Sequence, residues 1–403
     1  MKNKVVPPVF TVDFFTRNRR IFTSKLPKNT PAVLVANGLM QKNADLAFPF
    51  RQDSNFWYLT GIDEPDIILV LDKDDEYIIL PEVDKNFSIF NGTIDKEQLI
   101  HDSGIRTVLD SRTGINKLMS LIKRTKRAAI VDPPPSYIDQ IKLYTNPTKH
   151  QLKQSIQKSS QNNIEFFDIR PLLFQQRSIK QSEEVAAITY ANWHTKSLLE
   201  QIEQKVPRYK NERDILLDMN NYAHKFQLGF GYDPTIAHGK NAITLHYSSN
   251  ADDITDRPIL IDIGLSYKYY SADVSRTFSP VKNPRFEEVL ACVVSVHNYA
   301  VKLLKPKVLL ADYEKQVEQF MGDRLKDLGL LNVNNTKQVR KYFPHLTSHF
   351  LGLDVHDVGN YQEPLKPGMV LTVEPGIYIA DEQLGIRYED NILITDSASK
   401  IIS

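Results

Sequence analysis

The run from Ile259 to Gly264 constrains the fold more than any other segment, because an aspartate stands in the middle of it. Its other members are almost all isoleucine and leucine, which is typical of a strand that is buried on both faces. An unpaired carboxylate in such surroundings is strongly destabilising, so Asp262 needs a cation, hydrogen-bond donors or a raised pKa. For Asp262 taken alone, a turn or salt-bridge role stays open.

A second aspartate, Asp273, follows eleven residues later. The turn-forming residues between Gly264 and Lys268 predict a hairpin that places the two carboxylates side by side. Two adjacent like charges cannot both stay ionised without compensation. The pair therefore favours a metal site over a purely structural role.

The carboxy-terminal part of the chain adds further groups that can bind a metal. Glu374 ends an apolar, strand-like run, and Glu389 stands beside a run of isoleucines. Between the two pairs of carboxylates lies a cluster of histidines in the segment 345–357. Each histidine alone is more often structural than a ligand, but together with four strand-borne carboxylates they favour a metal centre.

The order Asp, Asp, His, Glu, Glu resembles the metallopeptidases of the pita-bread fold, which include aminopeptidase P, prolidase and methionine aminopeptidase. The resemblance rests on Asp262-x10-Asp273, the segment 349–359, Glu374-Pro375-Gly376 and the segment 385–390. The segment 50–61 is also similar to the N-terminal domain of aminopeptidase P, which methionine aminopeptidases lack. The resemblance therefore covers almost the whole chain and favours Xaa-Pro aminopeptidase.

The resemblance implies ligands for two divalent metal ions. Asp262 would bind one ion, His349 and Glu374 would bind the other, and Asp273 and Glu389 would bridge the two. Four carboxylates would then offset the charge of two cations. Oxygen-rich ligation with one imidazole suits a hard or borderline ion. Mn²⁺ is the family's usual ion, and Zn²⁺, Co²⁺ and Fe²⁺ stay open.

The implied reaction removes the first residue from peptides whose second residue is proline. The two ions would turn a shared water into a hydroxide that attacks the carbonyl before proline. His246 and His356 match histidines that donate hydrogen bonds to the substrate and its tetrahedral intermediate, and His345 and Arg387 match positions that line the proline pocket or support the ligands. Structural roles stay open for His246 as a strand cap and for Arg387 as a salt-bridge partner.

Other polar residues near these motifs are interpreted as structural. His238 stands where the family tends to have a small residue, and Asp354 and Asp357 are expected to accept hydrogen bonds within a loop. The chain carries Phe90 where the family usually has a tryptophan that reaches a neighbouring subunit's site. The family's expected assembly is a homodimer or a higher homo-oligomer.

Length and patterning predict an α/β protein of two domains, 1–175 and 176–403. The first is expected to be a mixed-sheet α/β domain with strands at 32–36, 67–71, 77–80 and 128–131 and helices at 9–24, 112–124 and 134–145. In the second, the patterning predicts a long helix from Ser182 and helices near 211–228, 284–305 and 311–329, and the resemblance implies a pita-bread α+β catalytic domain.

Composition narrows the classes of partner. The 50 Lys and Arg residues nearly cancel the 49 Asp and Glu residues, which gives no long-range attraction to nucleic acid or an anionic membrane. The single cysteine, Cys292, lies on an expected buried helix face and excludes an intrachain disulfide. No segment approaches 18 uncharged apolar residues. A cytoplasmic enzyme with peptide substrates is the expectation.

Two rival functions stay open. Prolidase cleaves only Xaa-Pro dipeptides and needs a cationic clamp for the free carboxylate, whereas the contexts 56–61 and Ser348-His349 favour aminopeptidase P. Pita-bread domains also act as metal-free binding modules, or on non-peptide C–N bonds as creatine amidinohydrolase does. Those relatives have lost ligands, while this chain keeps all five.

Overall fold

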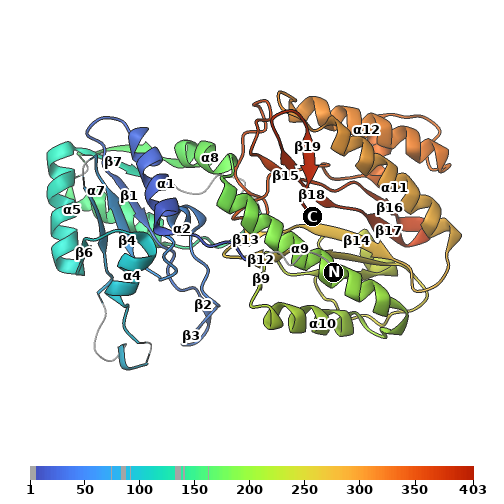
Figure 1. The fold of residues 1–403 in the computed structure, drawn as a ribbon, viewed down its shortest axis with the longest axis horizontal. Coiled ribbons are helices and arrows are strands. Elements are labelled where there is room, and N and C mark those ends of the chain that lie inside the picture. Colours follow the sequence, from blue (N-terminus) through green and yellow to red (C-terminus); the bar gives the residue numbers. More distant parts are fainter. Residues whose placement is uncertain are drawn as a thin grey trace. The chain divides into compact units, whose positions relative to one another are not determined.

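The computed structural model describes residues 6–73, 75–82, 88–90, 92–131, 138, 141–161 and 163–403. Contacts divide these residues into two compact units. The amino-terminal unit is Val9–Gln176, and the carboxy-terminal unit is Arg177–Ser403 together with residues 6–8. Each unit mixes helices with strands (Figure 1), so the expected two-domain α/β architecture is confirmed.

A six-stranded mixed sheet forms the centre of the amino-terminal unit, in the order β6-β5-β4-β1-β7-β8. Strand β4 is antiparallel to both neighbours, and the β5/β6, β1/β7 and β7/β8 pairs are parallel. The strands expected from the sequence are β1, β4, β5 and β7. The bounds are β1 (Ala32–Val35), β4 (Ile68–Leu71), β5 (Glu76–Ile79), β6 (Val108–Leu109), β7 (Arg127–Ile130) and β8 (Glu165–Asp168).

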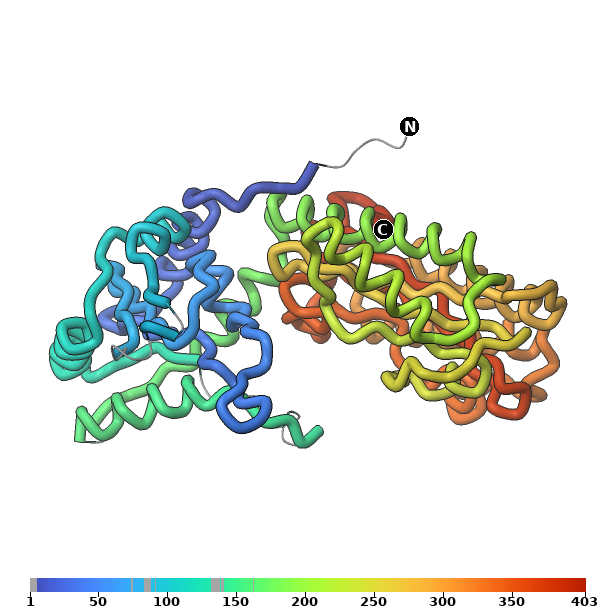
Figure 2. The backbone as a smooth tube through the Cα atoms, turned by 90° about the horizontal axis from the view of Figure 1, so that it is seen from below, coloured from blue at the N-terminus to red at the C-terminus, as the bar shows by residue number. Residues whose placement is uncertain are grey.

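Helices and one hairpin complete the amino-terminal unit. Helices α5 and α7 pack on the sheet and on each other, whereas α1, α2 and α4 pack together. The β2–β3 hairpin is exposed and extends away from the sheet (Figures 1 and 2). The bounds are α1 (Val12–Ser24), α2 (Ser54–Thr60), α4 (Lys96–Ser103), α5 (Ser111–Thr125), α7 (Thr148–Ser159), α8 (Arg170–Ser178), β2 (Gln41–Asn43) and β3 (Leu46–Ala47). The helix expected at 134–145 falls largely outside the described residues, and 141–145 are not helical.

Local sequence explains why the segment 50–61 folds as it does. The Asp53 side chain accepts hydrogen bonds from the backbone N–H of Asn55 and Phe56, which caps helix α2. Gly61 ends this helix with φ of 71°, a conformation that glycine adopts without strain. All seven residues of α2 are buried. The segment is therefore a structural part of the amino-terminal core.

The carboxy-terminal unit contains short sheets and long helices. The helices are α9 (Ser182–Lys205), α10 (Glu212–Lys225), α11 (Pro284–Leu303), α12 (Leu310–Asp327), α13 (Thr336–Tyr342) and the short η1 (Val206–Arg208), η2 (Gly239–Ile243) and η3 (Ala380–Glu382). The strands are β9 (Gly229–Phe230), β10 (Thr235–His238), β11 (Ile259–Ile263), β12 (Leu265–Tyr267), β13 (Tyr270–Ser271), β14 (Val274–Phe278), β15 (Val370–Val373), β16 (Gly376–Ile379), β17 (Leu384–Arg387), β18 (Asp390–Ile394) and β19 (Ser399–Ile401).

Two apolar clusters hold this unit together. One joins α9 and α10 to strands β10, β11 and β14, and the other joins α11, α12 and α13 to strands β15 to β18. The sheets are ordered β10-β11-β14, β13-β12-β9, β15-β18-β19 and β16-β17. Cys292 lies on α11 as expected, but it is only partly buried.

The two aspartates of the sequence motif lie close together, because β11, which contains Asp262, pairs antiparallel with β14, and Asp273 directly precedes β14. The predicted turn is displaced. Residues 265–267 form strand β12, and the chain reverses at Lys268 and Tyr269, which have φ of 49° and 70°. Strands β12 and β13 therefore form a small hairpin inside the larger one.

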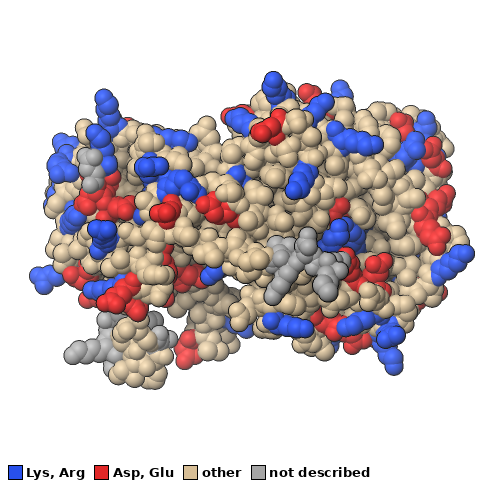
Figure 3. Space-filling model, in the orientation of Figure 1, with Lys and Arg blue, Asp and Glu red and all other residues tan. Residues whose placement is uncertain are grey.

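The charge of the surface agrees with the composition. On the face drawn in Figure 3, Lys and Arg side chains alternate with Asp and Glu on both units. Within the described part of the chain, no helix combines the length and apolar character that a bilayer crossing requires.

Candidate metal centre

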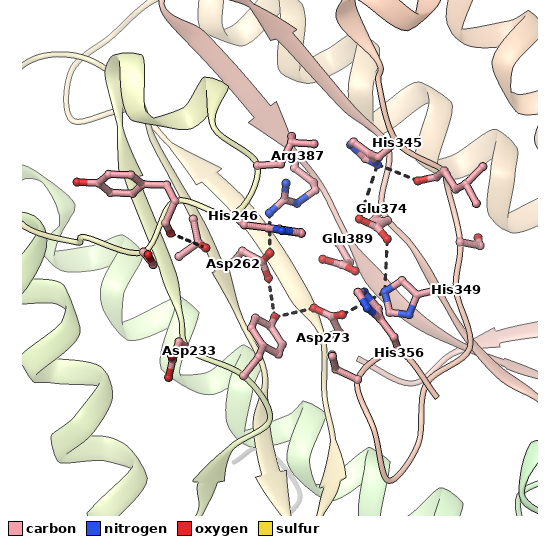
Figure 4. Close-up of a pocket in the computed structure, with 18 of the residues that line it drawn as sticks. Asp233, His246, Asp262, Asp273, His345, His349, His356, Glu374, Arg387 and Glu389 are labelled. Carbon is pink, nitrogen blue, oxygen red and sulfur yellow. Dashed lines mark hydrogen bonds and ion pairs between the residues drawn. The ribbon is translucent and has the colours of Figure 1, made fainter. Parts of the chain in front are cut away.

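A cavity of about 610 Å³ opens in the carboxy-terminal unit and collects every site residue that the sequence predicts. Its polar lining includes five carboxylates, four histidines and one arginine, and all of these except Asp233 point toward a common space (Figure 4). The predicted residues among the lining are His246, Asp262, Asp273, His345, His349, His356, Glu374, Arg387 and Glu389. Their individual roles stay predictions, but their convergence is a property of the fold.

Strand pairing explains how residues far apart in sequence meet. Asp262 lies on β11, and Asp273 directly precedes the neighbouring strand β14. Glu374 follows β15, and Glu389 precedes β18, which is antiparallel to β15. The Glu389 N–H donates to the carbonyl oxygen of Ser275 on β14 over 3.1 Å, and this bond joins the two halves of the site.

His349 is oriented as a metal ligand would be. Its Nδ1 lies 3.0 Å from the carbonyl oxygen of Phe350, so Nδ1 carries a proton. Its Nε2 lies 3.4 Å from an oxygen of Asp273 and 3.4 Å from an oxygen of Glu374. Asp273, His349 and Glu389 each offer one ligand atom, and these atoms lie within 4.8 Å of one another.

Arg387 holds one side of the cavity through three hydrogen bonds. Its Nη2 donates to Asp262 over 2.6 Å, and its Nη1 donates to the hydroxyl of Tyr378 over 2.8 Å. Its Nε donates to the hydroxyl of Ser275 over 2.8 Å, and that hydroxyl donates to Glu389 over 2.8 Å. Arg387, a residue that is only 4% exposed, therefore fixes two of the carboxylates, one directly and one through a serine.

In the metal-free chain, burial disfavours the ionised form of these carboxylates. Burial, and then the charges of Asp273 and Glu374, raise the pKa of Glu389 well above its ordinary value. Burial also raises the pKa of Glu374 to about 8, although His349 and Arg387 oppose the shift. The pKa of Asp262 is raised by burial against the opposing charge of Arg387. The site has more carboxylates than positive groups. When metal cations are absent, bound protons reduce this excess of negative charge.

The residues present fit divalent metal ions. The buried Oε1 of Glu389 has no hydrogen-bond partner among the described residues, although its other oxygen is bound by Ser275. An unpartnered buried carboxylate oxygen is strongly destabilising unless a cation reaches it. Four carboxylates and one imidazole also form the oxygen-rich donor set that hard or borderline ions prefer.

His349 responds to the same charges in the opposite direction. Burial alone would lower the pKa of its imidazolium, but the hydrogen bond to Asp273 and the charges of Glu374 and Asp273 raise it to about 9. In the metal-free chain His349 is therefore a cation that partly compensates the carboxylates. A bound metal ion would replace that proton, because only a neutral imidazole can act as a ligand.

The remaining histidines surround this cluster. His345 Nε2 lies 3.0 Å from the hydroxyl of Tyr378, and burial followed by the charge of Arg387 lowers the pKa of His345 to about 3. The rings of His356 and His349 meet edge to face with centroids 4.4 Å apart. His246 lies over Asp262 and points into the cavity (Figure 4).

The structural roles that were considered for several polar residues can be judged from where these residues lie. His246 follows η2 in a turn, so it does not cap a strand. His238 does not line the cavity, and its Nε2 accepts a hydrogen bond from the backbone N–H of Thr255. Asp354 and Asp357 also lie outside the lining. They accept charged hydrogen bonds from Arg177, so they are ion-pair partners more than loop acceptors.

Sequence reasoning missed three groups that touch the site. Tyr232 donates toward two of the aspartates, and Ser275 connects Arg387 with Glu389. Glu314 on α12 accepts hydrogen bonds from the backbone of the loop that carries His349. The signal for Tyr232 was its place between Gly231 and Asp233, just before the buried strand β10. For Ser275 and Glu314 the sequence carries no local signal.

Comparison with known proteins identifies the family. The family model of metallopeptidase family M24 matches residues 182–396, which is more than half of the chain. The chain belongs to metallopeptidase family M24. The amino-terminal unit of this M24 chain matches the model of the aminopeptidase P N-terminal domain over residues 15–131.

Relatives of known name span almost the full length of this M24 chain. An Xaa-Pro aminopeptidase of Haemophilus influenzae is 31% identical, covering 97% of the chain and 94% of the relative. An Xaa-Pro aminopeptidase of Escherichia coli is 29% identical, covering 96% and 93%. The structure of E. coli aminopeptidase P with the inhibitor Pro-Leu is 26% identical, has a TM-score of 0.85 and covers 98% of this chain and 95% of that one.

Proposed function

We propose that this chain is an Xaa-Pro aminopeptidase that hydrolyses the bond between the first residue of a peptide and a proline in second position. The observation that carries the proposal is the cluster of buried carboxylates around His349, in which one oxygen of Glu389 has no hydrogen-bond partner among the described residues. The full-length similarity to Xaa-Pro aminopeptidases supports the same substrate class.

Five residues would hold two divalent metal ions. Asp262 would bind one ion, His349 and Glu374 the other, and Asp273 and Glu389 would contact both. When bound, such ions supply Lewis-acid activation of water and of the peptide carbonyl. The finer expectations belong to the same proposal: Mn²⁺ as the ion, a homodimer or higher homo-oligomer as the assembly, and the cytoplasm as the location.

The other residues of the cavity would orient the peptide. His246 and His356 would donate hydrogen bonds to the substrate as negative charge develops on its carbonyl oxygen. Asp262 would attract the free amino group of the first residue, which restricts cleavage to the amino terminus. The bond from Arg387 to Tyr378, and from there to His345, would form a rigid wall for the proline ring.

The cavity favours peptides longer than a dipeptide. An Xaa-Pro dipeptide ends in a free carboxylate, which needs a cation near the proline. Among the described residues that line the cavity, Arg387 is the single Lys or Arg. Its guanidinium is already bound to Asp262, Ser275 and Tyr378. No described cationic clamp is therefore available, and a prolidase role is disfavoured.

A paired peptide assay tests the proposal. Protein stripped with chelator and reloaded with Mn²⁺ is given Xaa-Pro and Xaa-Pro-Xaa substrates of the same first residue, and release of that residue is measured. We expect efficient release from the tripeptide and weak release from the dipeptide. Activity on the dipeptide alone would indicate a prolidase. No activity on either, with no Mn²⁺ bound, would indicate a binding module.

A further inference from the structure

The hydroxyl of Tyr232 bridges the side chains of two proposed ligands. It lies 2.5 Å from Oδ1 of Asp262 and 2.6 Å from Oδ1 of Asp273. Asp262 on β11 and Asp273 just before the adjacent strand β14 lie 30 and 41 residues further along the chain. Within the described part of the chain, no other side chain forms hydrogen bonds with the carboxylates of both aspartates.

The backbone makes room for this tyrosine. The Gly231 N–H donates to the carbonyl oxygen of Gly264 over 2.8 Å, which places the segment before β10 against the end of β11. A Cβ at Gly264 would lie 2.8 Å from the Tyr232 ring and 1.9 Å from the carbonyl oxygen of Ala272. The ring therefore occupies a space that exists only because residue 264 has no side chain, and its hydroxyl is held over the aspartates.

The other oxygens of the two aspartates have different neighbours. Asp262 Oδ2 accepts from Arg387, and Asp273 Oδ2 faces His349 at 3.4 Å. A hydroxyl carries one proton, so Tyr232 donates to Oδ1 of one aspartate at a time. Oδ1 of the other aspartate then stays able to approach a cation. Donation to either carboxylate also weakens the repulsion between the two like charges.

We propose that Tyr232 is a positioning residue that ties Asp262 to Asp273 and thereby sets the affinity of the site for its pair of metal ions. The proposal deepens the proposed function and rests on it. Outer hydrogen bonds to ligand side chains typically change metal affinity about 10–100-fold. The expected effect of losing this hydroxyl is therefore on metal binding first and on turnover as a consequence.

The test compares Tyr232→Phe with Tyr209→Phe and the unaltered protein. Tyr209 donates to Asp218 over 2.6 Å and does not line the cavity. Tyr209→Phe therefore removes the same hydroxyl from a Tyr–Asp hydrogen bond outside the site. Free Mn²⁺ is measured by electron paramagnetic resonance during titration of each metal-free protein. Turnover of an Xaa-Pro-Xaa peptide is measured at several Mn²⁺ concentrations, and thermal unfolding of the metal-free proteins checks the fold.

We expect Tyr232→Phe to weaken Mn²⁺ binding about 10–100-fold and to lose turnover at limiting Mn²⁺. Turnover should recover as Mn²⁺ is raised, with KM for the peptide little changed, and Tyr209→Phe should match the unaltered protein. An unchanged Mn²⁺ titration of Tyr232→Phe would overturn the inference, whether or not turnover falls. If the unaltered protein binds no Mn²⁺, the proposed function itself fails.

Discussion

At the scale of single residues, charge dominates the behaviour of the site. Four carboxylates face one another in a cavity where Arg387 is the only Lys or Arg among the described lining residues. Burial raises the pKa of Glu389 and of Glu374, which favours their protonated forms in the metal-free chain. Binding of divalent cations should therefore release protons, because a carboxylate binds a metal ion only in its ionised form.

Replacement of Glu389 with glutamine should separate metal binding from folding. The amide keeps the hydrogen bond from Ser275 but removes a negative charge that two cations need. We expect turnover to fall below about one hundredth, since loss of a ligand exceeds the effect of losing an outer hydrogen bond. The metal-free variant should unfold at the same denaturant concentration as the unaltered protein, or higher. Near-normal turnover would contradict the bridging role. The matched control is Glu382→Gln, which makes the same change at the Arg285–Glu382 ion pair.

Replacement of His246 with alanine should lower turnover and leave metal binding intact. His246 lines the cavity, but its proposed partner is the substrate and not the metal ions. We expect kcat to fall about 10²-fold, which is typical for a lost hydrogen bond to a developing oxyanion, while both Mn²⁺ ions remain bound. Metal content and kcat are measured on the same samples, with the exposed His101→Ala as control. Loss of bound Mn²⁺ from His246→Ala would show that this histidine acts as a ligand.

At the scale of elements, the loop 345–359 places three of the four cavity histidines. Glu314 on α12 accepts hydrogen bonds of 3.0 to 3.1 Å from the backbone N–H groups of Thr347 and Ser348, which precede His349. The far end of the loop is held by Asp357, which is buried beside cations from α8 and the segment after it. The loop is therefore attached on both sides of the histidines.

Asp357 and Asp354 offer a matched pair for measuring that attachment. The Asp357 carboxylate is 2% exposed and accepts from Arg177 and Lys180, whereas Asp354 is 43% exposed and accepts from Arg177. We expect Asp357→Asn to reduce the free energy of unfolding by about 3–5 kcal/mol, because two cations stay buried with less compensation. Asp354→Asn should cost less than about 1 kcal/mol. Equal effects in urea denaturation would contradict this description of the loop.

Helix α9 contains a group that links stability to pH. Glu184 accepts from the backbone N–H of Gln181 and from the hydroxyl of Tyr270, and burial raises its pKa to about 7, with Lys180 opposing the shift. The folded state thus holds the proton more tightly than the unfolded state, whose ordinary value is 4.5. Stability from this group is full below pH 4.5 and falls as pH rises to about 7.

Replacement of Glu184 with glutamine should remove that pH dependence. One pKa unit corresponds to about 1.4 kcal/mol, so the variant should gain on the order of 3 kcal/mol over the unaltered protein at pH 8. At pH 4.5 the two proteins should have similar free energies of unfolding. Denaturation curves at both pH values measure the difference. A variant that is less stable at pH 8 would show that ionised Glu184 is stabilised by Lys180 more than burial destabilises it.

Much of the site could be predicted because its carboxylates stand within or directly beside buried strands. Asp262 and Glu389 stand among isoleucines, and polar residues in such positions are conspicuous in a single sequence. The predicted hairpin is confirmed, but its turn lies at the end of the predicted segment 264–268, because residues 265–267 form the short strand β12, which pairs with β9 more than thirty residues earlier. Tyr232 was missed for the same reason, since its function depends on strands that come later in the chain. Local pattern shows burial, but contacts between distant segments decide geometry.

At the scale of the whole molecule, the chain consists of two units with separate cores, and all five proposed ligands belong to the carboxy-terminal one. The M24 match lies within that unit, and the aminopeptidase P N-terminal match lies within the other. Phe90, which stands where the family usually has a tryptophan, is 85% exposed in the amino-terminal unit. The proposed peptidase reaction therefore depends on whether the cavity of the carboxy-terminal unit binds two metal ions.

Anomalous scattering from crystals grown with Mn²⁺ addresses this question directly. We expect two peaks about 3.5–4 Å apart, one beside Asp262, the other beside His349 and Glu374, and both in contact with Asp273 and Glu389. Absence of any peak at saturating Mn²⁺, with these five side chains ordered, would contradict the two-metal peptidase.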